Sequence, residues 1–118
     1  MERMVKIMNS ETLLTLIFVI AGASEIIQGF PLFLEKVKPN WLYGFRVSKT
    51  VNNPKIWYKI NKNMGRDFII AGLILVIGSL ITSLLNFSTN DIVAIGLILI
   101  VIPIVIIIIR CFIDLKKL

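Results

Sequence analysis

The chain alternates between long apolar runs and polar segments that hold nearly all of its charges. Three runs have the length and composition of membrane-crossing helices, residues 12–33, 68–87 and 92–109. Glu25 and Pro31 interrupt the first run, whereas the other two contain no charged residue. A helix of about 20 apolar residues spans the ~30 Å hydrocarbon core of a bilayer. We therefore predict an all-α integral membrane protein with three transmembrane helices, forming a single membrane domain over residues 1–118.

The segment between the first two runs, residues 34–67, contains signals of a short helix. Asn53-Pro54 is typical of a helix start, and Gly65 suits the position just after a helix end. Between them, apolar side chains fall on one arc of a helix and lysines on the opposite arc (Ile56, Trp57, Ile60 and Met64 against Lys55, Lys59 and Lys62). This predicts a short amphipathic helix in the lipid interface, where Trp41, Tyr43, Trp57 and Tyr58 suit the headgroup depth. A plain membrane anchor without a recognition role is the alternative.

The distribution of basic residues predicts the orientation in the membrane. Arg3 and Lys6 precede the first run, and the link between the second and third runs has no base. The other eleven lie in the 34–67 loop or after the third run (Lys36, Lys38, Arg46, Lys49, Lys55, Lys59, Lys62, Arg66, Arg110, Lys116 and Lys117). Basic residues in short loops stay cytoplasmic. We therefore predict a multi-pass protein of the cell membrane with its N-terminus outside and the loop and C-terminus cytoplasmic. The same rule favours an uncleaved first span over a signal peptide.

Composition argues against several classes of function. The net charge of +6 comes from bases that flank apolar runs, which indicates the lipid bilayer and its anionic headgroups as partners rather than nucleic acid. The chain has no histidine and one cysteine, so we predict no metal site and no cofactor. It has no nucleophile elbow, no glycine-rich phosphate loop and no paired carboxylates, and we do not expect an enzyme.

Glu25 is the single acidic residue inside a predicted span. An ionised side chain in mid-bilayer costs roughly 2.5–3.5 kcal/mol on insertion scales, so intramembrane acids are functional candidates by default. We hypothesise that Glu25 either stays protonated or pairs with Arg46 or another base of the loop. A tolerated glutamate near the membrane edge is the alternative.

Small residues in the second run predict close helix packing. Gly78 with Thr82, and Ser79 with Ser83, are spaced four residues apart, which brings them to one helix face. We expect this face to pack on the third span, and a homodimer seam is the alternative.

The loop motif resembles that of the SdpI family of small bacterial and archaeal membrane proteins. That family's pattern is N-x-x-x-G-x-R-T-P-x-T-L-x-N-x-x-x-W-x-x-x-N-R-x-x-G. This chain departs from it at Val47-Ser48, Val51 and Lys62. Its matching residues are Asn40, Gly44, Arg46, Thr50, Asn53, Trp57, Asn61 and Gly65.

The resemblance implies an immunity function, in which a membrane protein protects a producer cell from a secreted antimicrobial peptide, or a toxin sensor that acts on a regulator. The expected partners are a toxin peptide or a regulator protein, bound through the motif residues, with a homo-oligomer left open. A small proton-coupled transporter that uses Glu25 is a second hypothesis, although three spans and a long basic loop oppose it. A structural subunit of a membrane complex is a third.

Overall fold

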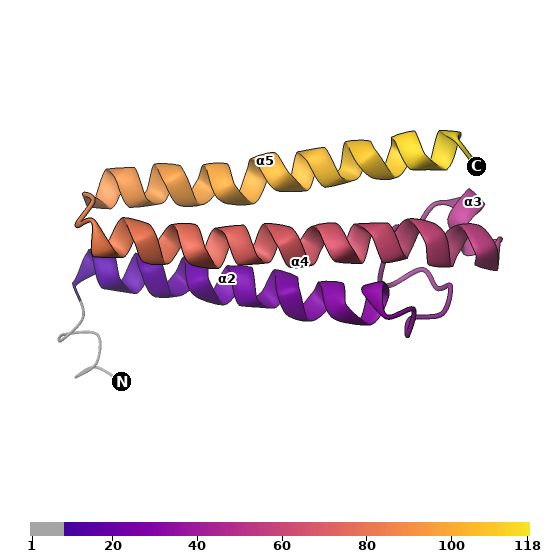
Figure 1. The fold of residues 1–118 in the computed structure, drawn as a ribbon, viewed down its shortest axis with the longest axis horizontal. Helices are drawn as coiled ribbons and strands as arrows, with labels where there is room; N and C mark the ends of the chain where they lie inside the picture. Colours follow the sequence, from indigo (N-terminus) through magenta and orange to yellow (C-terminus); the bar gives the residue numbers. More distant parts are fainter. Residues whose placement is uncertain (1–8) are drawn as a thin grey trace.

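The computed structural model describes residues 9–118, and every regular element within them is a helix. Three long helices, α2 (Ser10–Phe33), α4 (Pro54–Leu84) and α5 (Thr89–Lys116), lie side by side and alternate in direction (Figure 1). A single turn, α3 (Ser48–Val51), lies in the connection between α2 and α4. The three long helices are each long and apolar enough to cross a membrane. The prediction of an all-α, multi-pass membrane protein is confirmed.

Glycines allow α2 and α4 to approach closely. Gly22 faces Gly72 and Gly29 faces Gly65, so the two contacts lie seven residues apart on each helix. A Cβ atom added at Gly65 would lie 2.5 Å from the carbonyl oxygen of Gly29. Backbones in membranes pack this closely only where side chains are absent or small. These four glycines define the α2–α4 seam.

Helix α5 packs along the other side of α4, to which a short turn joins it. Gly78 of α4 faces Leu99 of α5, which agrees with the packing predicted for the second and third spans. Ser79 and Thr82 are buried, whereas Ser83 is exposed. Phe18 of α2 packs against Gly96 of α5. All three helices therefore contact one another, and a homodimer seam stays an untested alternative.

The predicted interfacial helix over residues 54–64 is not a separate element. It forms the first turns of α4, whose 31 residues extend for about 46 Å and so exceed the ~30 Å hydrocarbon core. Asn53 caps this helix as predicted, but the prediction that Gly65 ends a helix is wrong, because Gly65 lies buried in the α2–α4 seam. The helix between the first and second spans is α3 instead.

The apolar face of this projecting part is covered by protein, contrary to the predicted contact with lipid headgroups. Trp57 and Ile60 are 0% and 1% exposed. They pack under the loop and the neighbouring helix ends, because the polypeptide between α2 and α4 folds back over them.

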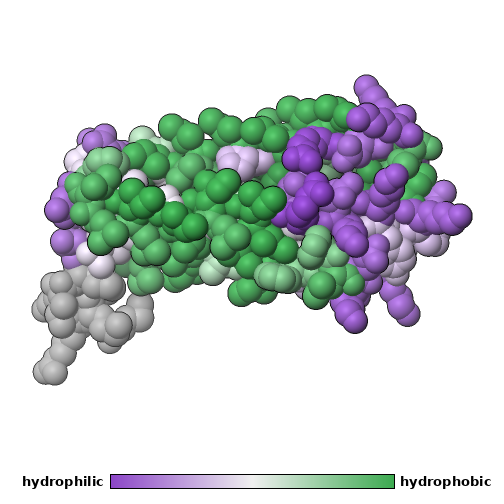
Figure 2. All heavy atoms as spheres, viewed as in Figure 1, coloured by the Kyte–Doolittle hydropathy of each residue, from purple (hydrophilic) through white to green (hydrophobic). Residues whose placement is uncertain are grey.

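The two ends of the bundle differ in polarity. Figure 2 shows an apolar band along most of the molecule and a concentration of hydrophilic residues at the end that holds the loop and the C-terminus. This matches the segregation of basic residues in the sequence, although Arg3 and Lys6 lie outside the described residues. The orientation relative to the cell stays a prediction.

Candidate partner-binding site

Asn40 and Gly44 shape the loop that follows α2. The Asn40 Oδ1 atom accepts hydrogen bonds from the backbone N–H groups of Leu42 at 2.8 Å and Tyr43 at 2.7 Å, which fixes a tight bend. Gly44 has a φ of +117°, a conformation that other residues rarely adopt. A Cβ atom there would also lie 2.7 Å from the Asn61 side chain. Only glycine fits at this position.

Trp57 and Asn61 attach the loop to α4. The Trp57 indole donates a hydrogen bond to the Val37 carbonyl at 2.8 Å. The Asn61 Oδ1 atom accepts from the Phe45 N–H at 2.6 Å, while its Nδ2 atom donates to the Trp57 carbonyl at 3.0 Å. Both side chains are buried, so these bonds satisfy groups that have no access to water.

Thr50 and Asn53 order the end of the loop. Thr50 is fully buried, and its hydroxyl oxygen accepts from the Val47 N–H at 3.1 Å and lies 2.8 Å from the Phe45 carbonyl oxygen. The Asn53 side chain accepts from the N–H groups of Lys55 at 3.1 Å and Ile56 at 3.4 Å, which caps α4. The polar atoms of these motif residues therefore bond within the chain and hold the loop in place. Partner binding by the motif residues stays a prediction.

Arg46 is the motif residue whose charged group reaches the surface. Its Nη1 atom donates to the Leu42 carbonyl and, at 3.4 Å, to the Trp41 carbonyl. The hypothesised ion pair with Glu25 is absent from residues 9–118, because the loop carbonyls engage Arg46 instead. Glu25 lies half-buried in α2, and its Oε2 atom has no hydrogen-bond partner within the described residues.

A groove of about 340 Å³ lies between the loop and all three long helices. Residues 42–46 form its loop side, and its helix side consists of Gln28 and Leu32 of α2, Met64 and Phe68 of α4, and Ile108 of α5. We call this the loop groove. Its volume falls within the range of ligand pockets, about 300–1,000 Å³. The Arg46 side chain brings a positive charge to an otherwise mainly apolar lining.

The loop folds back towards the membrane. The Tyr43 hydroxyl donates a hydrogen bond to the carbonyl of Gln28, which lies five residues before the end of α2 and so about 8 Å back along the helix. Burial raises the pKa of the Tyr43 phenol, so the hydroxyl keeps its proton and remains a donor. The loop groove therefore opens beside the membrane-crossing part of α2.

Asp67 is not identified by the sequence pattern, which assigns it to the end of the predicted loop. Asp67 lies in α4 with its side chain 9% exposed. Its Oδ1 atom lies 3.4 Å from Arg66 Nη2, and its Oδ2 atom lies 3.4 Å from Arg110 Nε of α5. One signal was present, since Asp67 is the single acidic residue between Glu35 and Asp91.

Comparison with known proteins agrees with the resemblance of the loop motif. The family model described as the SdpI/YfhL protein family matches residues 36–111, which is more than half of the chain and includes the loop, α4 and most of α5. No curated protein and no solved structure matches the chain. This multi-pass membrane protein belongs to the SdpI/YfhL family.

Proposed function

We propose that the chain is a membrane-embedded binding protein of the immunity or sensor type, not an enzyme, and that it binds a membrane-active peptide in the loop groove. Family membership supports the immunity function. One observation carries the proposal of a site: all three long helices and the folded loop line a single groove. The loop that closes it is held by hydrogen bonds of the motif residues, so a peptide meets a preformed surface.

The exposed groups around the loop groove indicate the chemistry of its ligand. Trp41 and Leu42, in the loop, are 57% and 88% exposed, and Leu42 lines the loop groove. Arg46 retains Nε and Nη2 donors that form no hydrogen bond within residues 9–118. An arginine binds a carboxylate through two parallel hydrogen bonds. The best ligand is therefore an amphipathic peptide with an apolar segment and a carboxylate, arriving along the membrane interface.

Protection of a sensitive host tests this function. Cells that express the chain should survive conditioned medium from its native host at doses that kill control cells. Leu42→Ser should lower the highest dose that the cells survive by about tenfold to a hundredfold, because a leucine contact that becomes buried on binding contributes about 1.5–3 kcal/mol. Leu84→Ser is the matched control, since Leu84 is 80% exposed and lies at the opposite end of α4.

The proposed contact between Arg46 and a peptide carboxylate is tested by a second matched pair of variants. Arg46→Gln should also reduce protection, whereas Lys55→Gln removes an exposed charge outside the loop groove and should leave protection intact. Immunoblots of membrane fractions verify that all variants insert equally. Absence of protection by the unmodified chain, or full protection by both Leu42→Ser and Arg46→Gln, contradicts the proposal.

A proton-coupled transporter is a second candidate, favoured by the buried, unpartnered Oε2 atom of Glu25. A transporter predicts ethidium-dependent proton flux in proteoliposomes, measured with a pH-sensitive dye, and loss of that flux in Glu25→Gln. The binding proposal predicts no flux for either chain. The two candidates therefore differ in the behaviour of the unmodified protein.

A further inference from the structure

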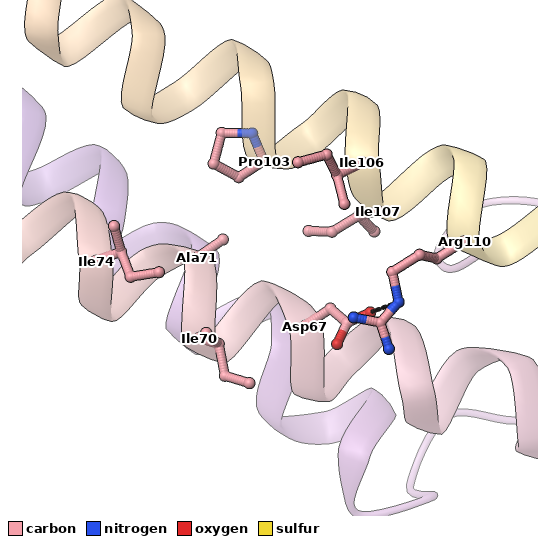
Figure 3. A pocket seen from close by; sticks show the side chains of 8 residues that line it. All are labelled: Asp67, Ile70, Ala71, Ile74, Pro103, Ile106, Ile107 and Arg110. Carbon is pink, nitrogen blue, oxygen red and sulfur yellow. Dashed lines mark ion pairs between the residues drawn. The ribbon is translucent and has the colours of Figure 1, made fainter.

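A second cavity lies between α4 and α5, away from the loop groove. It has a volume of about 220 Å³ and a mainly apolar lining, which includes Ile70 and Ala71 of α4 and Pro103 and Ile106 of α5. Figure 3 shows these side chains around the space between the two helices, with Asp67 and Arg110 at one end. We call it the α4–α5 cleft. It exists because the short side chain of Ala71 lies opposite Pro103, which leaves a gap between longer isoleucines.

The α4–α5 cleft begins at a membrane boundary and extends into the apolar region. Asp67 directly precedes the apolar run of α4, and Arg110 directly follows that of α5. From this end, the lining residues extend over seven residue steps of each helix, or about 10 Å. One leaflet contributes about 15 Å to the hydrocarbon core. The cleft therefore lies within a single leaflet and has the length of an acyl-chain segment.

The charges at the cleft entrance suit an anionic headgroup. The side chains of Arg66 and Arg110 are 44% and 51% exposed, and both contact the nearly buried carboxylate of Asp67. Two guanidinium groups and one carboxylate give a net charge of +1, which a single phosphodiester balances. The terminal nitrogens of Arg110 form no hydrogen bond within residues 9–118, so they are available to phosphate oxygens. Basic pockets between transmembrane helices bind anionic headgroups in this way.

We infer that the α4–α5 cleft is a binding site for one anionic phospholipid, whose acyl chain lies against Ala71 and Pro103 and whose phosphate contacts Arg110 and Arg66. Asp67 and Arg110 line the cleft, and Arg66 contacts Asp67 from beside it. Together the three side chains leave one positive charge uncompensated. The lipid completes the contact between α4 and α5, the helix pair that packs less closely than the α2–α4 seam. This inference does not depend on the proposed peptide ligand.

Lipid retention by the purified full-length chain tests the site. The protein is reconstituted in vesicles of equal parts phosphatidylglycerol and phosphatidylcholine, extracted, and examined by native mass spectrometry. We expect one retained phosphatidylglycerol per chain and about a fivefold preference over phosphatidylcholine, which is the contribution of one basic group near a membrane surface. Arg110→Gln should abolish the preference, and Lys55→Gln, an exposed charge on the projecting part of α4, should preserve it.

A second pair of variants tests the cleft itself. Ala71→Leu fills the cavity beside Ala71 and should abolish retention of both lipids, whereas Ala94→Leu, at an exposed position of α5, should retain them. If Ala71→Leu does not give monodisperse protein, Ile106→Trp blocks the same space from a half-exposed position. Equal lipid retention by the blocked and unmodified chains overturns the inference. The inference is also overturned if the purified protein is a lipid-free dimer that Ala71→Leu dissociates. In that case a second copy of the chain, not a lipid, occupies the cleft.

Discussion

At the residue scale, Asn61 joins two parts of the chain that lie 16 residues apart. Asn61→Ala should destabilise the fold by about 1–3 kcal/mol, because the Phe45 N–H loses its acceptor at a partly buried position. Titration of the protein in micelles with sodium dodecyl sulfate, followed by tryptophan fluorescence, measures the change. Asn63→Ala is the control, since Asn63 lies on the same helix, is half-buried and forms no side-chain hydrogen bond within residues 9–118. Equal stability of the two variants contradicts the assigned role of Asn61.

Individual side chains also show the limit of sequence reasoning. The resemblance to the family pattern identified Asn61 and Trp57, and the proline after Asn53 identified the cap. The partner of Asn61 depends on the path of the loop, which no local pattern encodes. Trp57 was misplaced because an apolar helix face has the same spacing whether protein or lipid covers it. Asp67 was missed because its partner Arg110 lies 43 positions away in the sequence.

At the scale of elements, the α2–α4 seam depends on the absence of side chains. Gly65→Ala should disrupt this helix pair, because the new Cβ atom would lie 2.5 Å from the Gly29 carbonyl oxygen and 2.6 Å from the Phe33 nitrogen. Backbone atoms cannot move aside as a flexible side chain does. Gly78→Ala is the matched control, because its new Cβ atom would meet only the end of the Leu99 side chain. The same detergent titration should show a large loss of stability for Gly65→Ala and little change for Gly78→Ala.

This pair of variants also distinguishes two functions of glycine. If Gly65 ended a helix in the left-handed conformation, alanine would cost only about 1–2 kcal/mol, the penalty of a Cβ atom in that conformation. In the seam, the new Cβ atom meets backbone atoms of a second helix and separates the pair, which is a larger loss. The sequence pattern is compatible with both a helix end and a close approach, because glycine suits each. The lengths of the apolar runs predicted the three long helices correctly, since hydrocarbon thickness constrains them directly. The pattern does not predict that residues 54–64 continue into the second span, because Gly65 is equally typical of a helix end.

At the scale of the whole molecule, the loop motif and both candidate binding sites lie at one end of the bundle. The loop groove, the entrance of the α4–α5 cleft and the projecting turns of α4 all lie on the side of the basic residues. At the opposite end, the turn between α4 and α5 contains no basic residue. Which end faces the cytoplasm decides from which side a peptide reaches the loop groove. From the positive-inside rule we predict that the groove lies on the cytoplasmic side.

Cysteine labelling tests this orientation. Lys59→Cys and Asn90→Cys introduce thiols at exposed positions of the basic end and of the opposite end, in a background in which Cys111 is replaced by serine. A reagent that cannot cross membranes should label Asn90→Cys in intact cells and Lys59→Cys only in inverted vesicles. Labelling of Lys59→Cys in intact cells would place the loop groove outside, where a secreted peptide arrives first. In that case the groove would intercept the peptide before insertion, whereas the predicted orientation requires the peptide to cross to the inner leaflet before it is bound.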